Sequence, residues 1–122
     1  MESKLLDALN EAQKKAVTNV SQNCLVVAGA GSGKTRVLTQ RIIWLISQKN
    51  YSPLSILAVT FTNKAANEIK SRLSESLNLN IQNLWVGTFH GICYRILRQH
   101  FLAAKLDKNF QIIDSEDQIR LI

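Results

Sequence analysis

Cysteine, proline and glycine are scarce in this sequence of 122 residues, which contains two Cys, one Pro and five Gly. The two cysteines lie far apart, with no CxxC spacing and no neighbouring histidine cluster, so neither a disulfide-stapled miniprotein nor a zinc site is indicated. The low glycine and proline content excludes a collagen-like repeat, and a hydrophobic content of 46% excludes a disordered polymer. We expect one ordinary globular domain, with Cys24 and Cys93 as reduced thiols in its core.

Long apolar runs are also missing from the sequence. The longest extend over only four or five residues, too few for a membrane span, and the N-terminal segment MESKLLDALNEAQKK has no signal-peptide core. We therefore expect a cytoplasmic protein with no membrane partner. The formal net charge of +6 favours an anionic partner such as nucleic acid, a nucleotide or acidic lipid. Since the basic residues form no polybasic run, charge alone does not choose among these.

Short apolar runs typical of strands alternate along the chain with amphipathic segments typical of helices. Strands are expected at 24–28, 56–61, 84–89 and 110–113, and helices at 9–20, 34–48, 63–77 and 91–104, with a last helix capped by Asp114 or Ser115. The all-apolar run CLVVA at 24–28 is typical of a strand buried on both faces of a sheet. Trp44 and Trp85 are expected as core anchors, and His100 as a helix-end residue. The order predicts an α/β fold with a mostly parallel sheet flanked by helices.

The segment AGAGSGKT at residues 28–35 lies between the first expected strand and its helix, and it predicts a phosphate-binding P-loop. Its three glycines permit backbone conformations that let successive N–H groups converge on phosphate oxygens at a helix N-terminus. Lys34 is expected to reach the β and γ phosphates, and the Thr35 hydroxyl to coordinate the Mg²⁺ that bridges them. The strict pattern begins with Gly, whereas this chain has Ala28, a position that mainly shapes the turn. A nucleoside triphosphate is the expected ligand.

Two polar segments follow the next two expected strands, TFTN at 60–63 and GTFH at 87–90. In doubly wound folds, ligands gather beyond the carboxyl ends of the strands, so both segments are expected at the working edge of the sheet. Their hydroxyl, carboxamide and imidazole groups suit a sugar-phosphate backbone, and their phenylalanines suit stacking on an unpaired base. Core packing of Phe61 and Phe89 is the alternative, and the sequence does not decide between the two.

Four blocks, in order, resemble motifs of the UvrD/Rep/PcrA group of superfamily 1 DNA helicases. LNEAQKKAV (9–17) resembles the Q motif, AGAGSGKTRVL motif I (Walker A), ILAVTFTNKAANEIKSRL motif Ia, and GTFHGICYRILR motif Ib. The tail FQIIDSEDQIRLI is similar to the segment that leads into the helical 1B insertion. The resemblance implies that residues 1–122 are the N-terminal portion of motor domain 1A, a truncated domain of a P-loop NTPase with a RecA-like fold.

The resemblance implies an ATP-driven motor that moves 3′ to 5′ on single-stranded DNA and unwinds duplex at junctions, in DNA repair or replication. The resemblance also implies that Gln13 forms a hydrogen bond with the adenine and that Arg36 lies beside the nucleotide. The triphosphate and Mg²⁺ are held by the P-loop, with Lys34 and Thr35 in the catalytic roles; its residues are Ala28, Gly29, Ala30, Gly31, Ser32, Gly33, Lys34 and Thr35. DNA contacts are implied for Phe61, Thr62, Asn63, Thr88, Phe89 and His90. At Gly91 the family commonly has Ser.

Other parts of such a motor are not found in this sequence. The aspartate-glutamate pair that positions Mg²⁺ and water has no match, because Asp114 is followed by Ser115 and is better explained as a helix cap. By the resemblance, the arginine fingers, the aromatic residue that stacks on adenine and the second motor domain would all lie beyond residue 122, in the remainder of the helicase chain, which is an expected partner of this part. We expect ATP binding without efficient hydrolysis. A small P-loop kinase and a non-catalytic nucleotide-binding module remain alternatives.

Overall fold

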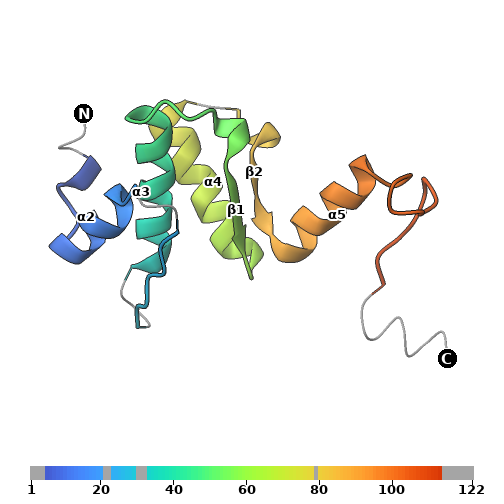
Figure 1. Ribbon diagram of the computed structural model, residues 1–122, viewed down its shortest axis with the longest axis horizontal. Helices are drawn as coiled ribbons and strands as arrows, with labels where there is room; N and C mark the ends of the chain where they lie inside the picture. Colours follow the sequence, from blue (N-terminus) through green and yellow to red (C-terminus); the bar gives the residue numbers. More distant parts are fainter. Residues whose placement is uncertain (1–4, 21–22, 30–32, 79, 114–122) are drawn as a thin grey trace.

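Two parallel strands and their flanking helices make up the part of the chain that the computed structural model describes, namely residues 5–20, 23–29, 33–78 and 80–113. The elements in chain order are α2 (Glu11–Thr18), α3 (Lys34–Ser47), the 3₁₀ turn η1 (Pro53–Ser55), β1 (Leu57–Thr60), α4 (Asn63–Leu77), the 3₁₀ turn η2 (Ile81–Asn83), β2 (Trp85–Thr88) and α5 (Phe89–Gln99). Figure 1 shows α2 at one end of the molecule and α5 at the other, with the strands between them. The expected α/β class is confirmed at this level.

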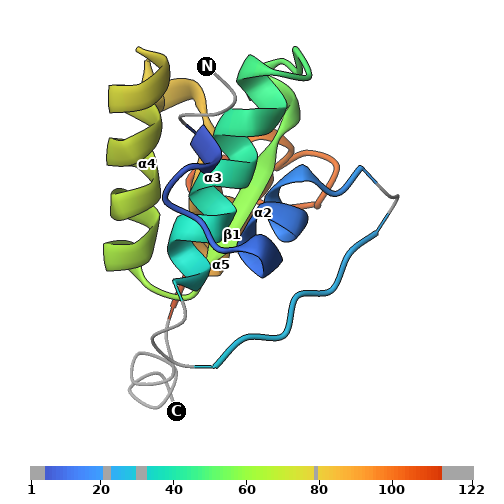
Figure 2. The ribbon, with the colours of Figure 1, turned by 90° about the vertical axis from the view of Figure 1, so that its left-hand side faces the viewer.

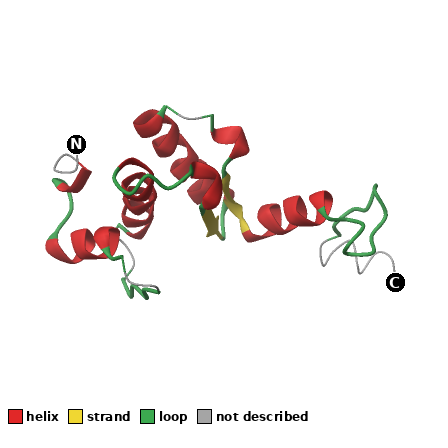
Figure 3. Ribbon diagram, turned by 45° about the horizontal axis from the view of Figure 1, so that its top comes forward, coloured by secondary structure: helices red, strands yellow, loops and turns green. Residues whose placement is uncertain are grey.

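The strands β1 and β2 pair in parallel, and α4 forms the connection between them. Their register places Leu57 opposite Trp85 and Thr60 opposite Thr88. Both strands therefore end at the same edge of the sheet, and the residues that follow Thr60 and Thr88 become neighbours. Figure 3 shows these two strands in yellow among helices and loops.

Local capping signals explain where the helices begin and end. The Thr62 hydroxyl accepts a bond from the Ala65 amide at the start of α4, and Asn78 ends this helix in a left-handed conformation, with φ of 50°. The bounds of α4 match the expected 63–77, and Glu68 and Arg72 form an ion pair on this helix at 3.0 Å. Helix α2 is shorter than the expected 9–20, because Asn10 caps it and Asn19 leaves the helical conformation.

The main core joins α3 and α4 to the two strands. Ile69 and Leu73 of α4 are fully buried, and Ile42 and Ile43 of α3 pack in the same cluster. The strand residues of this cluster are Ala58 and Val86. A second cluster of Leu9, Val17 and Trp44 packs α2 against α3, so the expected role of Trp44 as a core anchor is confirmed. Val17 of α2 is fully buried in this cluster, whereas Val20, beyond the end of the helix, is exposed.

The segment 24–28 is not the buried strand that its apolar composition predicts. No described residue pairs with it, and the side chains of Leu25 and Val27 are 87% and 88% exposed. Figure 2 shows the segment as an extended loop that lies apart from β1. A strand with apolar side chains on both faces needs neighbouring strands and covering helices, and β1 and β2 pair only with each other. The RecA-like arrangement around this strand thus stays a prediction.

The expected strand 110–113 is also absent from the described part of the chain. Phe110 packs instead against Tyr94 of α5, with ring centroids 5.7 Å apart, and Arg98 donates a hydrogen bond to the Lys108 carbonyl at 2.6 Å. These contacts pack residues 108–110 against α5. The helix ends at Gln99, whereas the sequence predicted an end near residue 104. His100 is its C-cap, which agrees with the expected helix-end position. The expected caps Asp114 and Ser115, with the last helix, lie outside the described residues.

Both cysteines contradict the expectation of core thiols, because Cys24 and Cys93 are exposed and free. Cys24 belongs to the segment that did not form a strand, which explains its exposure. Trp85 is only partly buried, and the Arg95 guanidinium group lies over its ring. Among the described helices, none is both long enough and apolar enough to cross a lipid bilayer.

Candidate nucleotide site and nucleic-acid edge

A cavity of about 640 Å³ lies between α2, the segment 24–28 and the start of α3. Gln13, Ala28 and Lys34 contribute to its lining. These three residues come from the Q-motif segment, the first P-loop position and the P-loop lysine, which are separated in sequence. The volume falls within the range of about 300–1,000 Å³ that is typical of small-molecule sites. The structure thus brings together the predicted base-binding and phosphate-binding residues.

Gln13 is held at the N-terminus of α2 by a capping box. Its side-chain Oε1 accepts a hydrogen bond from the Asn10 amide at 2.9 Å, and Asn10 Oδ1 accepts one from the Gln13 amide at 2.8 Å. This reciprocal pair fixes the orientation of the Gln13 side chain. A Cβ atom placed on Gly33 would lie 3.4 Å from Gln13 Nε2. The glutamine therefore lies directly against the last glycine of the P-loop.

The N-terminus of α3 has the features of an anion site. Gly33 caps the helix in a left-handed conformation with φ of 80°, and as a glycine it provides no side-chain cap. The first turn has no acidic residue and carries Lys34 and Arg36. Unsatisfied amides and the positive end of the helix dipole favour phosphate oxygens. The left-handed Gly33 confirms the predicted need for glycine at this position.

The donors present fit a triphosphate with Mg²⁺. Lys34 is exposed at the N-terminus of α3, and Thr35 follows it in the first turn. In a P-loop, the hydroxyl of the Ser or Thr after the lysine is one ligand of the Mg²⁺ that the phosphates also bind. Thr35 is anchored through its carbonyl, which accepts a 2.7 Å bond from the buried Thr39 hydroxyl. Gly29 is exposed, and the predicted site residues Ala30, Gly31 and Ser32 lie outside the described residues.

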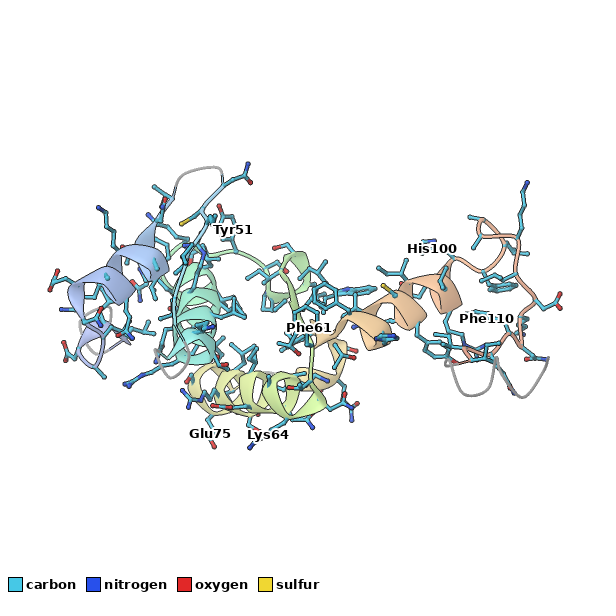
Figure 4. All side chains as sticks on the ribbon, turned by 90° about the horizontal axis from the view of Figure 1, so that it is seen from below. Tyr51, Phe61, Lys64, Glu75, His100 and Phe110 are labelled. Atoms are coloured by element: carbon cyan, nitrogen blue, oxygen red, sulfur yellow. The ribbon has the colours of Figure 1, made fainter. Side chains whose placement is uncertain are left out.

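Phe61 and Phe89 form an aromatic pair at the end of the sheet. Their ring centroids are 5.0 Å apart, with an interplanar angle of 42°. Each follows directly after one of the paired residues Thr60 and Thr88, which explains their proximity. Phe61 is 90% exposed and Phe89 47% exposed, so the core-packing alternative is wrong for Phe61. In Figure 4, Phe61 lies beside the start of α5.

The polar residues of the two edge segments have structural roles as well as accessible positions. Thr62 caps α4, and Thr88 caps α5 by accepting a 3.0 Å bond from the Gly91 amide. His90 is exposed in the first turn of α5. A Cβ atom on Gly91 would lie only 3.1 Å from the Thr88 hydroxyl oxygen, so a serine here would require this capping group to shift.

A second cavity, of about 560 Å³, opens between α4, β2 and α5. Asn63 and Thr88, both predicted DNA contacts, line it together with Lys70 and Arg95, to which the sequence assigned no role. The Arg95 guanidinium stacks over the Trp85 ring at 3.8 Å from the centroid and donates a 2.8 Å bond to the Leu84 carbonyl. The helical spacing could have indicated Arg95, because it lies four residues after Gly91, on the same face of α5, and both residues line this cavity.

A model of the UvrD/REP helicase N-terminal domain matches residues 9–122, and the chain belongs to this family. The chain is 56% identical over 120 residues to DNA helicase II of Escherichia coli (strain K12) and 55% identical over 124 residues to DNA helicase II of Haemophilus influenzae. It is 46% identical over 120 residues to the ATP-dependent DNA helicase PcrA of Bacillus subtilis (strain 168). Each match covers 98% of this chain but only 16% to 17% of the relative. The resemblance stated from the motifs is confirmed.

Proposed function

We propose that this chain is the nucleotide-binding part of a 3′ to 5′ ATP-dependent DNA helicase, with one contact surface for single-stranded DNA and with DNA repair or replication as its setting. The observation that carries the proposal is the cavity shared by Gln13, Ala28 and Lys34 beside the N-terminus of α3, which begins at the left-handed Gly33. The names of the relatives, DNA helicase II and ATP-dependent DNA helicase PcrA, support the same reading. The cytoplasm is the location that fits such a protein.

In this proposal each group has a defined task. The amides at the start of α3 and the Lys34 ammonium bind the triphosphate, and Gln13 bonds the edge of the adenine. Arg36 would lie beside the nucleotide, and the Thr35 hydroxyl would be a ligand for Mg²⁺, which would supply positive charge to the phosphates. Binding, rather than turnover, is the activity proposed for these residues.

The DNA surface consists of the aromatic pair and its polar neighbours. Phe61 and Phe89 stack against unpaired bases, while Thr62, Asn63, Thr88 and His90 contact the backbone. Lys70 and Arg95 add positive charge in the adjacent cavity. Because the phosphate contacts are few, affinity for single-stranded DNA is weak and falls steeply with salt.

The test is a titration of the chain with a fluorescent non-hydrolysable ATP analogue and Mg²⁺. Lys34→Ala is compared with Lys64→Ala, which removes an exposed lysine from α4. We expect Lys34→Ala to weaken binding about tenfold or more, since hydrogen bonds to charged groups contribute about 1.5–3 kcal/mol, and Lys64→Ala to leave it unchanged. Equal binding by both variants would favour the non-catalytic module. Phosphate transfer to a small acceptor would favour the kinase.

A further inference from the structure

The C-terminal end of α2 is held by one side chain from α3. Arg41 Nη1 donates hydrogen bonds to the carbonyls of Ala16 and Val17, both at 3.0 Å, and of Asn19 at 2.8 Å. Since this nitrogen carries two N–H groups, the three carbonyls share them. These contacts join positions 22 to 25 residues apart in sequence. Arg41 thus connects the end of one helix to the middle of another.

The physical need for such a contact follows from the length of α2. A helix of eight residues is marginal by itself, and its last carbonyls lack partners within the helix. A guanidinium satisfies several of them at once and places a positive charge at the negative end of the helix dipole. The apolar contact through Val17 and Trp44 also holds α2 on α3, but such packing is non-directional. Arg41 therefore adds the directional part of the attachment.

The other end of α2 carries Gln13, which lies against Gly33. Arg41 comes seven residues, or about two helical turns, after Lys34 on α3. Arg41, Lys34 and Gln13 all line the same cavity. A rotation or shift of α2 on α3 would therefore change the distance between Gln13 and the phosphate-binding turn, without altering either group itself.

We infer that Arg41 is a positioning residue of the nucleotide site, which fixes α2 so that Gln13 meets the base while α3 holds the phosphates. The inference rests on the proposed function. It assigns Arg41 to base recognition through Gln13 and not to phosphate binding. Loss of Arg41 should therefore weaken binding of a ligand with a base more than binding of a ligand that has phosphates alone.

The experiment compares Arg41→Gln with Arg41→Lys, and uses Arg72→Gln, which breaks an exposed ion pair on α4, as the matched control. Two quantities are measured in the 122-residue chain: hydrogen exchange of the α2 amides without nucleotide, and the affinities for the ATP analogue and for inorganic tripolyphosphate with Mg²⁺. For Arg41→Gln we expect α2 exchange to accelerate about tenfold or more while α4 exchange is unchanged. We expect a similar loss of ATP-analogue affinity, with tripolyphosphate affinity retained.

Arg41→Lys should give intermediate values, because an ammonium keeps the charge but lacks the planar fork. This variant also provides the comparison if Arg41→Gln does not fold. Unchanged α2 exchange in both variants, or a parallel loss of affinity for both ligands, would overturn the inference. If the unsubstituted chain binds neither ligand, the proposed nucleotide site itself is wrong. If the unsubstituted chain binds both ligands and the Arg41 variants bind them equally well, only the role of Arg41 is wrong.

Discussion

Phe61 and Phe89 lie with their ring centroids 5.0 Å apart, each directly after the last residue of one of two paired strands. The in-register pairing of Thr60 with Thr88 places the two rings side by side at the carboxyl edge of the sheet. A tilted pair of rings, one of them almost fully exposed, offers an apolar surface where solvent has free access. Because exposed rings contribute little to the stability of the fold, we interpret this aromatic surface as a stacking site for a planar ligand such as a nucleobase.

Phe61→Ala is therefore expected to weaken binding of a short oligothymidylate by about 1–3 kcal/mol, the usual contribution of one stacked base. The unfolding free energy should change by less than about 0.5 kcal/mol, because the ring is exposed. Tyr51→Ala is the control, since Tyr51 is also exposed but its amide bonds the Leu45 carbonyl near the end of α3. Figure 4 shows the two residues apart. Fluorescence anisotropy at low salt measures the difference, and equal affinities for both variants would argue against stacking.

Gly33 and Gly29 differ in conformation, and this predicts different responses to alanine. Gly33 has φ of 80°, where a side chain costs about 1–2 kcal/mol, so Gly33→Ala should lower the unfolding free energy by about that amount. Gly29 lacks a left-handed φ, and a Cβ atom there meets no described atom within 4 Å. Gly29→Ala should change stability by less than about 0.5 kcal/mol. Urea titration provides both values, and an equal cost at the two positions would contradict the assigned conformations.

The sequence predicted those elements that are stabilised by nearby residues. The N-cap at Thr62, the left-handed end at Asn78 and the helical spacing of Ile69 and Leu73 all lie within or beside α4, and its bounds were predicted correctly. The proximity of Phe61 and Phe89 was also predictable, because parallel strands end at a common edge. Gln13, Ala28 and Lys34 line one cavity, and their binding of a nucleotide stays a prediction.

Features that depend on distant partners were not predictable in the same way. The composition of 24–28 suits a buried strand, but burial requires neighbouring strands that the local sequence does not supply. Phe110 looked like a strand residue because of its apolar neighbours, yet it packs on Tyr94 of α5. The contact of Arg41 with the end of α2 has no local signal, since its acceptors are backbone carbonyls of another helix.

Both thiols are expected to react with a water-soluble disulfide reagent in the folded chain, because Cys24 and Cys93 are exposed. Cys24 lines the larger cavity, whereas Cys93 lies on α5. A bound ATP analogue should therefore slow modification of Cys24 and leave the rate at Cys93 unchanged. Mass spectrometry after timed labelling distinguishes the two sites. Protection of both cysteines, or of Cys93 alone, is incompatible with the proposed location of the nucleotide.

Asn78 ends α4 with φ of 50°, and its amide bonds the Ser74 carbonyl at 3.0 Å. Glycine adopts this conformation without steric cost, so Asn78→Gly should leave the unfolding free energy equal or slightly higher. A β-branched residue is strained there, and Asn78→Val should lower it by about 1–2 kcal/mol. Thermal and urea unfolding check the order, which a Val variant as stable as the Gly variant would refute.

The central claim is that the amides around the start of α3 bind a triphosphate next to Gln13. The most direct measurement is a nuclear magnetic resonance titration of the ¹⁵N-labelled chain with the non-hydrolysable ATP analogue and Mg²⁺. The account predicts saturable shifts of the Gly29, Gly33, Lys34 and Thr35 amides and of the Gln13 side-chain amide, with those of α4 unmoved. Amides of the P-loop that stay unshifted at millimolar analogue, while the chain remains folded, would contradict it.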